Sequence, residues 1–246
     1  MTIDLSGKNI LVTGSEGGLG RVMVKTLLDA GANVISQDIR KPEACVQAVA
    51  EHGLDPIWYE CDIAKPDAVE AMFADLMQKV ESLDVLVNNA GIRKDGLLVR
   101  LSVEQWDAVL DVNLKGVFLC TQAAVRHMMR ARKGKVITIS SIAGLMGNAG
   151  QTNYAATKAG VIAMTKTWAR EYSKRGLSFN AIAPGLIETP MTENLPEKEK
   201  SLLMQGIPAG AMGKSQDVAN GVLFLACGLA DYINGEVLRI DGGLAM

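Results

Sequence analysis

Two side chains able to carry out acid–base chemistry, Tyr154 and Lys158, stand four positions apart in a stretch whose pattern predicts a helix. Residues at this spacing share one helix face. A tyrosine with an ordinary pKa near ~10 is a poor acid–base group at neutral pH, but a neighbouring ammonium favours the phenolate and lowers that pKa. Ser141 follows a predicted strand, and its hydroxyl can hold a substrate oxygen. On spacing alone, a Tyr/Lys pair is more often an ordinary surface pair, so other motifs must decide.

A glycine-rich segment follows the first predicted strand and leads directly into a predicted helix. Glycines let the chain turn sharply and approach a pyrophosphate, and the helix then offers its N-terminal N–H groups to the anion. The spacing Gly14-x3-Gly18-x-Gly20 differs from the common GxGxxG, and a purely structural turn is the alternative. Its place between strand and helix favours phosphate binding. The predicted phosphate loop comprises Gly14, Ser15, Glu16, Gly17, Gly18, Leu19 and Gly20.

Acidic residues follow the next two predicted strands. Asp38 ends the second strand, 18 residues beyond Gly20, where a carboxylate accepts hydrogen bonds from an adenosine ribose. The alternative for Asp38 is a solvated loop acid. Asp62 and Ile63 follow the third strand, near the place expected for an adenine ring, and the alternative for Asp62 is to cap the segment leading to Pro66.

Short apolar runs alternate with longer helical patterns along the whole chain. The predicted strands are 9–13, 33–36, 57–60, 83–88, 135–140, 177–182 and 236–240, and the predicted helices are 19–30, 43–52, 66–80, 103–130, 153–174 and 216–225. Continuously apolar strands are buried on both faces. The alternation therefore predicts an α/β fold, a Rossmann-type doubly wound parallel sheet of about seven strands with helices on both faces. Residues 1–246 form a single domain in this interpretation. The charged, Met-rich and Pro-punctuated segment 188–213 is expected to be a substrate lid.

Composition narrows the class of protein. The chain has 246 residues, 48% of them hydrophobic and 21% charged, as in ordinary globular proteins. A net charge of −2 gives no reason to expect a nucleic acid or an anionic membrane as partner. No apolar run reaches about 18 residues and no signal peptide is evident, so we expect a cytoplasmic protein without a membrane span. The four cysteines form no CxxC pair and are expected to be buried thiols, and no metal site is predicted.

Several separate motifs resemble those of the short-chain dehydrogenase/reductase family over essentially the whole chain. The loop from Thr13 to Gly20 is similar to the family's cofactor loop, and the sequence Asn88-Asn89-Ala90-Gly91 matches its strand-four signature. Four residues match the catalytic tetrad in order and spacing: Asn113, Ser141, Tyr154 and Lys158. A later segment resembles the one that contacts the nicotinamide carboxamide, with Pro184, Gly185, Ile187 and Thr189.

The resemblance implies NAD(P)-dependent hydride transfer between the cofactor and a carbonyl or alcohol carbon. Tyr154 would be the general acid in reduction and the general base in oxidation. Lys158 would bind the nicotinamide ribose and lower the pKa of Tyr154. Ser141 would orient the substrate oxygen. Asn113 would hold a water in a proton relay through Lys158, with an internal helix kink as its alternative.

Within the family, the resemblance is nearest to the 3-oxoacyl-[acyl-carrier-protein] reductases of fatty acid biosynthesis, through segments 88–98, 147–156 and 183–192. Arg132 and Arg175 fall where that group receives the acidic carrier protein, and solvated helix-end charges are the alternative. Other possible substrates are a 3-hydroxyacyl-CoA, a polyol, a sugar or a steroid. The matching tetrad argues against a non-enzymatic cofactor-binding scaffold. The resemblance also implies a homotetramer, with the long predicted helices packed against a neighbour's copies.

One position departs from the pattern of that group. The fatty-acid reductases generally use NADPH and carry basic or small polar residues near the adenosine ribose. This chain has Asp38 there, and Gly17 where many NADPH-using relatives carry a basic residue. A carboxylate repels a 2′-phosphate, so the sequence favours NAD(H) over NADP(H). Arg40 and Lys41 oppose this interpretation, because they lie just beyond Asp38.

Overall fold

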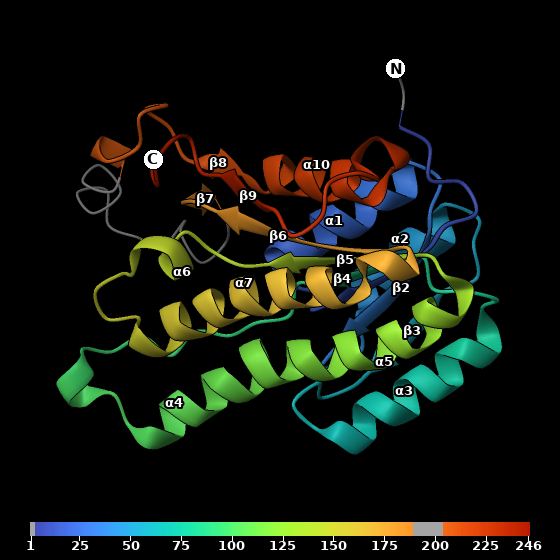
Figure 1. Cartoon of the computed structure of the whole chain (residues 1–246), viewed down its shortest axis with the longest axis horizontal. Helices are drawn as coiled ribbons and strands as arrows, with labels where there is room; N and C mark the ends of the chain where they lie inside the picture. The colour runs from blue at the N-terminus through green and yellow to red at the C-terminus, as the bar shows by residue number, and fades with distance from the viewer. Residues whose placement is uncertain (1–2, 189–203) are drawn as a thin grey trace.

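The computed structural model describes residues 3–188 and 204–246 and shows a central sheet between two helical layers (Figure 1). Its seven-stranded sheet has the order β3-β2-β1-β4-β5-β6-β9, and every neighbouring pair is parallel. The strands are β1 (Asn9–Thr13), β2 (Asn33–Asp38), β3 (Ile57–Glu60), β4 (Val85–Asn88), β5 (Gly134–Ile139), β6 (Leu177–Pro184) and β9 (Val237–Ile240). The predicted doubly wound α/β fold is therefore confirmed.

The strands are continuously apolar because each feeds two hydrophobic cores. In β1, Ile10 and Val12 belong to one core and Leu11 to the other. In β5, Ile137 belongs to the first core and Val136 to the second. Successive side chains of a strand point to opposite faces of the sheet, so both faces must be covered by helices.

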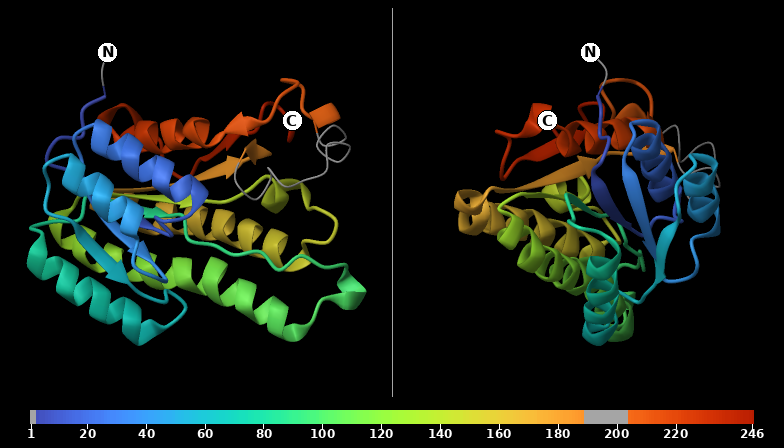
Figure 2. Two further views of the ribbon diagram at one scale, coloured as in Figure 1. Left: turned by 180° about the vertical axis from the view of Figure 1, so that it is seen from behind. Right: turned by 90° about the vertical axis from the view of Figure 1, so that its right-hand side faces the viewer.

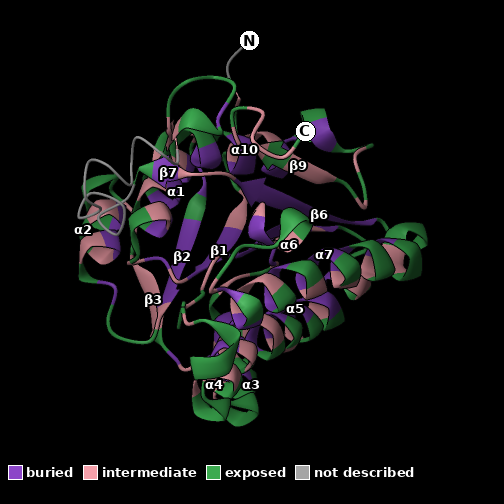
Figure 3. Cartoon of the chain, turned by 90° about the vertical axis from the view of Figure 1, so that its left-hand side faces the viewer, coloured by how far each residue is buried: buried purple, intermediate pink, exposed green. Residues whose placement is uncertain are grey.

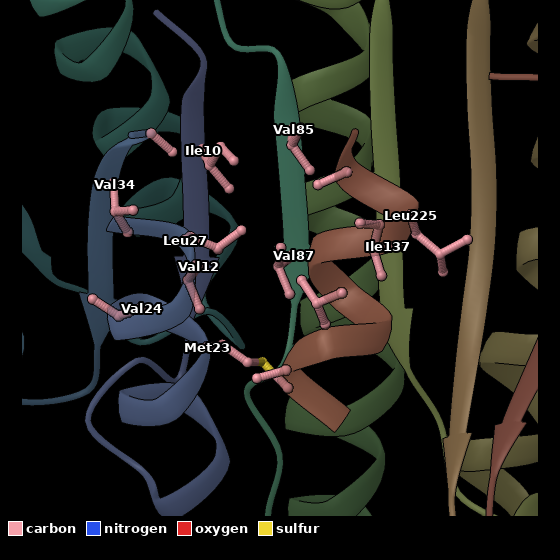
Figure 4. Packing of buried hydrophobic residues seen from close by; sticks show 14 of the residues in the cluster. Ile10, Val12, Met23, Val24, Leu27, Val34, Val85, Val87, Ile137 and Leu225 are labelled. Carbon is pink, nitrogen blue, oxygen red and sulfur yellow. The ribbon is translucent and has the colours of Figure 1, made fainter. Parts of the chain in front are cut away.

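One face is covered by α1 (Gly18–Asp29), α2 (Glu43–Glu51) and α10 (Ser215–Ala226). Figure 4 shows Met23 and Leu27 of α1 and Leu225 of α10 packed among strand side chains such as Val12 and Val87. Helices α1 and α10 lie side by side on this face, as Figures 1 and 2 both show. This layer fixes the start of α1, where the phosphate loop enters the helix.

The other face is covered by α3 (Pro66–Lys79), α5 (Val117–Ala131) and α7 (Thr152–Tyr172), with α4 (Val103–Leu110) leading into α5. Figure 3 shows these helices buried on the side facing the sheet and exposed on the side facing solvent. Phe73 and Leu76 of α3, Met128 of α5 and Phe179 of β6 are among the buried residues of this core. The four cysteines are free and buried, as predicted.

The long helical stretch predicted over 103–130 is present, but it is not a regular α-helix throughout. A π-helical turn, η2 (Asp111–Gly116), separates α4 from α5. By length and composition the stretch Val103–Ala131 could cross a membrane. Here its apolar side is part of the core instead, because α5 buries Cys120, Ala124 and Met128 against the sheet and α3.

Several short elements lie outside the predicted pattern: η1 (Leu98–Arg100), α6 (Ala143–Met146), β7 (Ile187–Glu188), β8 (Gly213–Lys214), η3 (Ser173–Arg175) and η4 (Gly228–Ala230). Strand β7 pairs with β8, so the two ends of the predicted lid segment are joined at its base. Residues 189–203 lie outside the described residues, and the lid at 188–213 remains a prediction.

We expect a clear difference between two alanine substitutions at glycines with positive φ. Gly176 has φ +78°, and a Cβ there would lie 2.2 Å from the Arg132 carbonyl oxygen. Gly53 has φ +73° with nothing within 4 Å of the added atom. Gly53→Ala should therefore lower the free energy of unfolding by about 1 kcal/mol, and Gly176→Ala by roughly 3 kcal/mol. Denaturant unfolding of both variants checks this, and equal losses would contradict the steric argument.

Candidate active site

The predicted site residues gather at the carboxyl edge of the sheet, near the boundary between β1 and β4. Strand order reverses there, since β1 is followed by β2 on one side and by β4 on the other. Open α/β sheets bind ligands in the crevice at such a switch point. Ser141 follows β5, Tyr154 lies in the first turn of α7, and the phosphate loop follows β1.

Tyr154 is half-buried and lies near Ser141, whose hydroxyl oxygen accepts a hydrogen bond from Ala143 N at 3.1 Å. Burial raises the pKa of Tyr154, while the Ser141 hydrogen bond and the Arg93 charge lower it by smaller amounts and Asp95 raises it further. Burial is the largest of these effects, and the expectation that Lys158 lowers the pKa of Tyr154 stays a prediction. The phenol is protonated at neutral pH, which is the state that a general acid needs.

Lys158 is buried directly beside the tyrosine. Its ammonium lies 5.5 Å from the centroid of the Tyr154 ring and donates a hydrogen bond to the Ile139 carbonyl at 2.7 Å. Burial lowers the pKa of Lys158 to about 8. The Ser140 hydroxyl donates to the Lys158 carbonyl at 2.8 Å. Helix α7 and the end of β5 therefore each donate one hydrogen bond to the other. An ammonium has three N–H donors, so Lys158 can also serve ribose hydroxyls.

Asn113 is fully buried in the π-helical turn, and both ends of its amide are used. Oδ1 accepts from Ile92 N at 2.8 Å, and Nδ2 donates to Ile92 O at 2.9 Å. A Cβ on Gly91 would lie 3.3 Å from Asn113 Oδ1 and 3.7 Å from Lys158 Nζ, so the three residues meet. The side chain thus holds the loop after β4 in place. The turn around Asn113 is π-helical, and the water relay remains a prediction.

The loops after β1 and β4 are tied together through Thr13. Its hydroxyl oxygen accepts hydrogen bonds from Asn89 N at 3.1 Å and Ala90 N at 3.2 Å. Asn89 in turn donates its Nδ2 to the Gly14 carbonyl at 2.8 Å. Sequence reasoning quoted Thr13 within the motif without assigning it this role. The bonds hold the phosphate loop against the strand-four signature.

The phosphate loop has the features that a pyrophosphate requires. A Cβ on Gly20 would lie 2.2 Å from the Gly14 carbonyl oxygen, so only glycine lets α1 pack directly on the loop. The N-cap of α1 is Gly17, which supplies no side-chain hydrogen bond. The buried Ser15 hydroxyl has no partner among the described residues. Backbone N–H groups and this hydroxyl therefore fit an anion. A nicotinamide dinucleotide bound here would supply the hydride.

The two predicted nucleoside acids differ in their contacts. Asp38 is half-buried at the end of β2, and its Oδ2 accepts a hydrogen bond from Glu16 N at 2.9 Å. This bond brings the Asp38 carboxylate beside the phosphate loop, as a ribose acid requires. Asp62 Oδ1 accepts from Ala64 N at 3.0 Å, which is the capping alternative. Ile63 is buried, and its side chain lies where a Cβ on Gly116 would come within 2.8 Å.

The predicted nicotinamide segment lies at the end of β6. Pro184 O accepts from Ile142 N at 3.0 Å, next to Ser141 in the chain. Gly185 N donates to Ile240 O at 2.9 Å, and Ile187 is buried in β7. Thr189 lies outside the described residues.

A loop that precedes η1 packs over the start of α7. Gly96 N donates to Gly150 O at 2.7 Å, and Gln151 Nε2 donates to Asp95 Oδ2 at 3.0 Å. These bonds explain why the charges of Arg93 and Asp95 act on Tyr154. The sequence pattern assigned no role to Arg93 or Asp95. Both lie in segment 88–98, which resembles the 3-oxoacyl-[acyl-carrier-protein] reductases, and no other feature pointed to them. Among the described residues, no group of three or more His, Cys, Asp or Glu is placed to hold a metal ion.

Arg132 and Arg175 are exposed and close together, but far from Tyr154. An Arg132 guanidinium nitrogen donates to the Lys174 carbonyl at 3.2 Å. Arg132 precedes β5 and Arg175 precedes β6, so both lie at the opposite edge of the sheet from Ser141. Along α7, Tyr154 and Arg175 are separated by roughly 30 Å at ~1.5 Å per residue.

Comparison with known proteins agrees with this architecture. A family model described as enoyl-(acyl carrier protein) reductase matches residues 14–245. A 3-oxoacyl-[acyl-carrier-protein] reductase of Thermotoga maritima is 47% identical, with 98% of this chain and 99% of that protein covered. The protein of the same name from Aquifex aeolicus is 43% identical, with 99% of this chain and 100% of that protein covered.

A solved structure extends the likeness to three dimensions. It is a protein of Agrobacterium tumefaciens, provisionally named 2-deoxy-D-gluconate 3-dehydrogenase, with bound NADP. It is 37% identical, superposes with a TM-score of 0.91, and covers 99% of this chain and 98% of its own. With the sheet order, the tetrad geometry and these relatives together, the chain belongs to the short-chain dehydrogenase/reductase family of oxidoreductases.

Proposed function

We propose that this protein reduces a 3-oxoacyl thioester carried by acyl carrier protein to the 3-hydroxyacyl thioester, oxidising a reduced nicotinamide cofactor. The observation that carries the chemistry is the half-buried Tyr154 beside the buried Lys158 ammonium, which lies 5.5 Å from the centroid of the tyrosine ring, with Ser141 close by. The substrate class is supported by full-length relatives named 3-oxoacyl-[acyl-carrier-protein] reductase. A partner of this kind is a soluble protein, so we infer that the reaction takes place in the cytoplasm.

In this proposal the chain's own residues bind the substrate carbonyl oxygen and supply the proton that it receives. The hydroxyls of Ser141 and Tyr154 both donate to the substrate carbonyl oxygen, which stabilises the charge that develops there. The carbonyl carbon receives the hydride, and Tyr154 transfers its proton to the oxygen, so the product is the neutral alcohol. The Lys158 ammonium stabilises the phenolate that is left.

A second candidate reaction is oxidation of a sugar acid or another secondary alcohol. It is favoured by the Agrobacterium relative, whose name describes a 2-deoxy-D-gluconate 3-dehydrogenase. The same three side chains would serve it, with Tyr154 as the general base. The two candidates differ in the substrate that binds beside Ser141 and in the direction of hydride transfer, so substrate comparison separates them.

Replacing Tyr154 tests the shared chemistry. Tyr154→Phe removes only the hydroxyl, so the fold and cofactor affinity should be kept while kcat falls at least a hundredfold, about 2.7 kcal/mol. Steady-state kinetics and cofactor titration check this. Tyr232→Phe is the control, because Tyr232 is fully exposed and should retain wild-type kcat. A Tyr154→Phe enzyme with more than about a tenth of the wild-type kcat would refute the role of Tyr154.

We further propose that Arg132 and Arg175 receive the acidic carrier protein. Because the pair lies roughly 30 Å along α7 from its own Tyr154, we infer that a carrier docked there serves the site of a neighbouring subunit. That arrangement rests on the homotetramer implied by the family resemblance.

Substitution of these arginines should separate carrier-bound from small substrates. In Arg132→Ala and Arg175→Ala, kcat/KM for acetoacetyl carrier protein should fall by about tenfold and lose much of its salt dependence, since the cations steer the partner. Acetoacetyl-CoA should be turned over as by wild type. Arg126→Ala removes an exposed cation of α5 that is not one of the two proposed docking residues, and it serves as the control. Equal losses of kcat/KM on both thioesters would refute the docking proposal. In a separate substrate comparison, a wild-type preference for 2-deoxy-D-gluconate would favour the second reaction.

For the cofactor we propose a preference for NAD(H) over NADP(H). The Agrobacterium relative holds NADP, and the proposal for this chain rests instead on Asp38. Its carboxylate lies beside the phosphate loop through the bond from Glu16 N. Free ribose hydroxyls can donate to a carboxylate, whereas a 2′-phosphate there would meet a like charge.

Wild-type enzyme should therefore show the higher kcat/KM with NADH. Asp38→Asn keeps an acceptor for Glu16 N and removes the charge, so the NADH/NADPH ratio should fall by about tenfold. Glu60→Gln is the control, since Glu60 pairs with Asp38 in the sheet register but is exposed on β3. A wild-type preference for NADPH would overturn the proposal, and an unchanged ratio in Asp38→Asn would exclude Asp38 as the discriminating residue.

A further inference from the structure

The side chain of Glu16 reaches from the phosphate loop to a second helix. Its Oε1 accepts a hydrogen bond from Ala44 N at 3.3 Å, and its Oε2 accepts one from Cys45 N at 3.4 Å. Both donors lie in the first turn of α2, whose N-cap residue, Pro42, supplies no side-chain hydrogen bond. The first N–H groups of a helix lack partners within the helix and attract negative charge. Glu16 therefore fills, from within the chain, a position where an anion would be stabilised.

Glu16 also holds the first cation of α1. The Arg21 guanidinium donates a short hydrogen bond to Glu16 Oε1. The Glu16 side chain is only 22% exposed, against 55% for Arg21. The carboxylate is thus enclosed between α1 and α2, and the positive charge of Arg21 is engaged by an acid of the same chain.

The main chain of Glu16 is in contact with the proposed ribose acid. Its N–H donates to Asp38 Oδ2 at 2.9 Å. Asp38 and Glu16 therefore bring two carboxylates to one turn of the loop. The Lys41 ammonium lies 5.4 Å from the centroid of the Trp58 ring, so this neighbouring cation has an aromatic partner of its own.

From these contacts we infer that Glu16 is a second specificity-determining residue for the cofactor, acting against a ribose 2′-phosphate. A phosphate entering beside Asp38 would find two groups that could bind it, the N–H groups at the start of α2 and the Arg21 guanidinium, already paired with Glu16. A ribose with free hydroxyls has no such conflict. This inference rests on the cofactor preference proposed above and assigns it a determinant that can be separated from Asp38.

The decisive variant is Glu16→Gln. Its amide oxygen keeps one acceptor for the start of α2, while the negative charge is lost and Arg21 is released. The Kd for NADPH should fall on the order of tenfold, because the released Arg21 can then bind the phosphate. The Kd for NADH should stay within about twofold of the wild-type value. Fluorescence titration of the full-length protein measures both constants. No acyl substrate is needed, so failure of the proposed reductase activity does not affect the result.

Two further variants keep the inference falsifiable. Glu43→Gln removes an exposed acid from the same end of α2 and should leave both Kd values unchanged. Arg21→Ala should not alter NADPH binding in the wild type, but it should abolish the gain in the Glu16→Gln background, because the freed guanidinium then has a phosphate to bind.

A purely structural Glu16 gives a different result. Loss of the cap on α2 would then lower the melting temperature and weaken NADH and NADPH binding equally, and that outcome overturns the inference. If Glu16→Gln does not fold, Glu16→Ser replaces it, since the short neutral side chain removes the charge and releases both Arg21 and the start of α2. A wild-type preference for NADPH refutes the Asp38 proposal, whereas an unchanged Kd ratio in the Glu16 variants refutes this one.

Discussion

Burial of the Lys158 ammonium is the constraint on which the site depends. Only 4% of this residue is exposed, and a charge removed from water is stable only when polar groups surround it. The Ile139 carbonyl meets this need, but only because β5 ends there and α7 passes directly across it. Ser140 returns a hydrogen bond to the Lys158 carbonyl, and a Cβ on Gly144 would lie 2.5 Å from that carbonyl carbon. The strand end, α6 and α7 must therefore meet at Lys158.

The surroundings of Lys158 also include the loop after β4 at Gly91, and Asn113 in the π-helical turn before α5 binds that loop. The loop after β4 passes close to the Lys158 ammonium, and Asn113 holds that loop with both ends of its amide. The helix widens to a π-helical turn at this position, a distortion that recurs at functional sites. Through Thr13 and Asn89, the loop is then joined to the phosphate loop.

Local pattern predicted the parts of the site that depend on a single element. Ser141 was placed at the sheet edge because the strand before it is apolar, and Tyr154 and Lys158 were placed together by their spacing on one helix. The widened turn at 111–116 does not follow from the periodicity of 103–130, and its Asn113 side chain bonds to the main chain of Ile92, 21 residues away. The pairing of β7 with β8 is likewise set by contacts distant in sequence. The direction of the Tyr154 pKa depends on burial, which no spacing reveals.

The phosphate loop shows why identity of residue type is an incomplete guide to specificity. Glycine spacing accounts for its close approach to α1, and any dinucleotide could use that approach. What distinguishes this chain is the set of charges around it: Asp38 receives the loop N–H, and Glu16 draws Arg21 and the start of α2 to itself. Arg21 would count as a phosphate-binding cation in a census of charges, yet its partner in the fold is an acid. A cation contributes to recognition only when its charge is available, and availability is decided by tertiary contacts. The proposed cofactor preference therefore depends on which charges the fold leaves unpaired around Asp38.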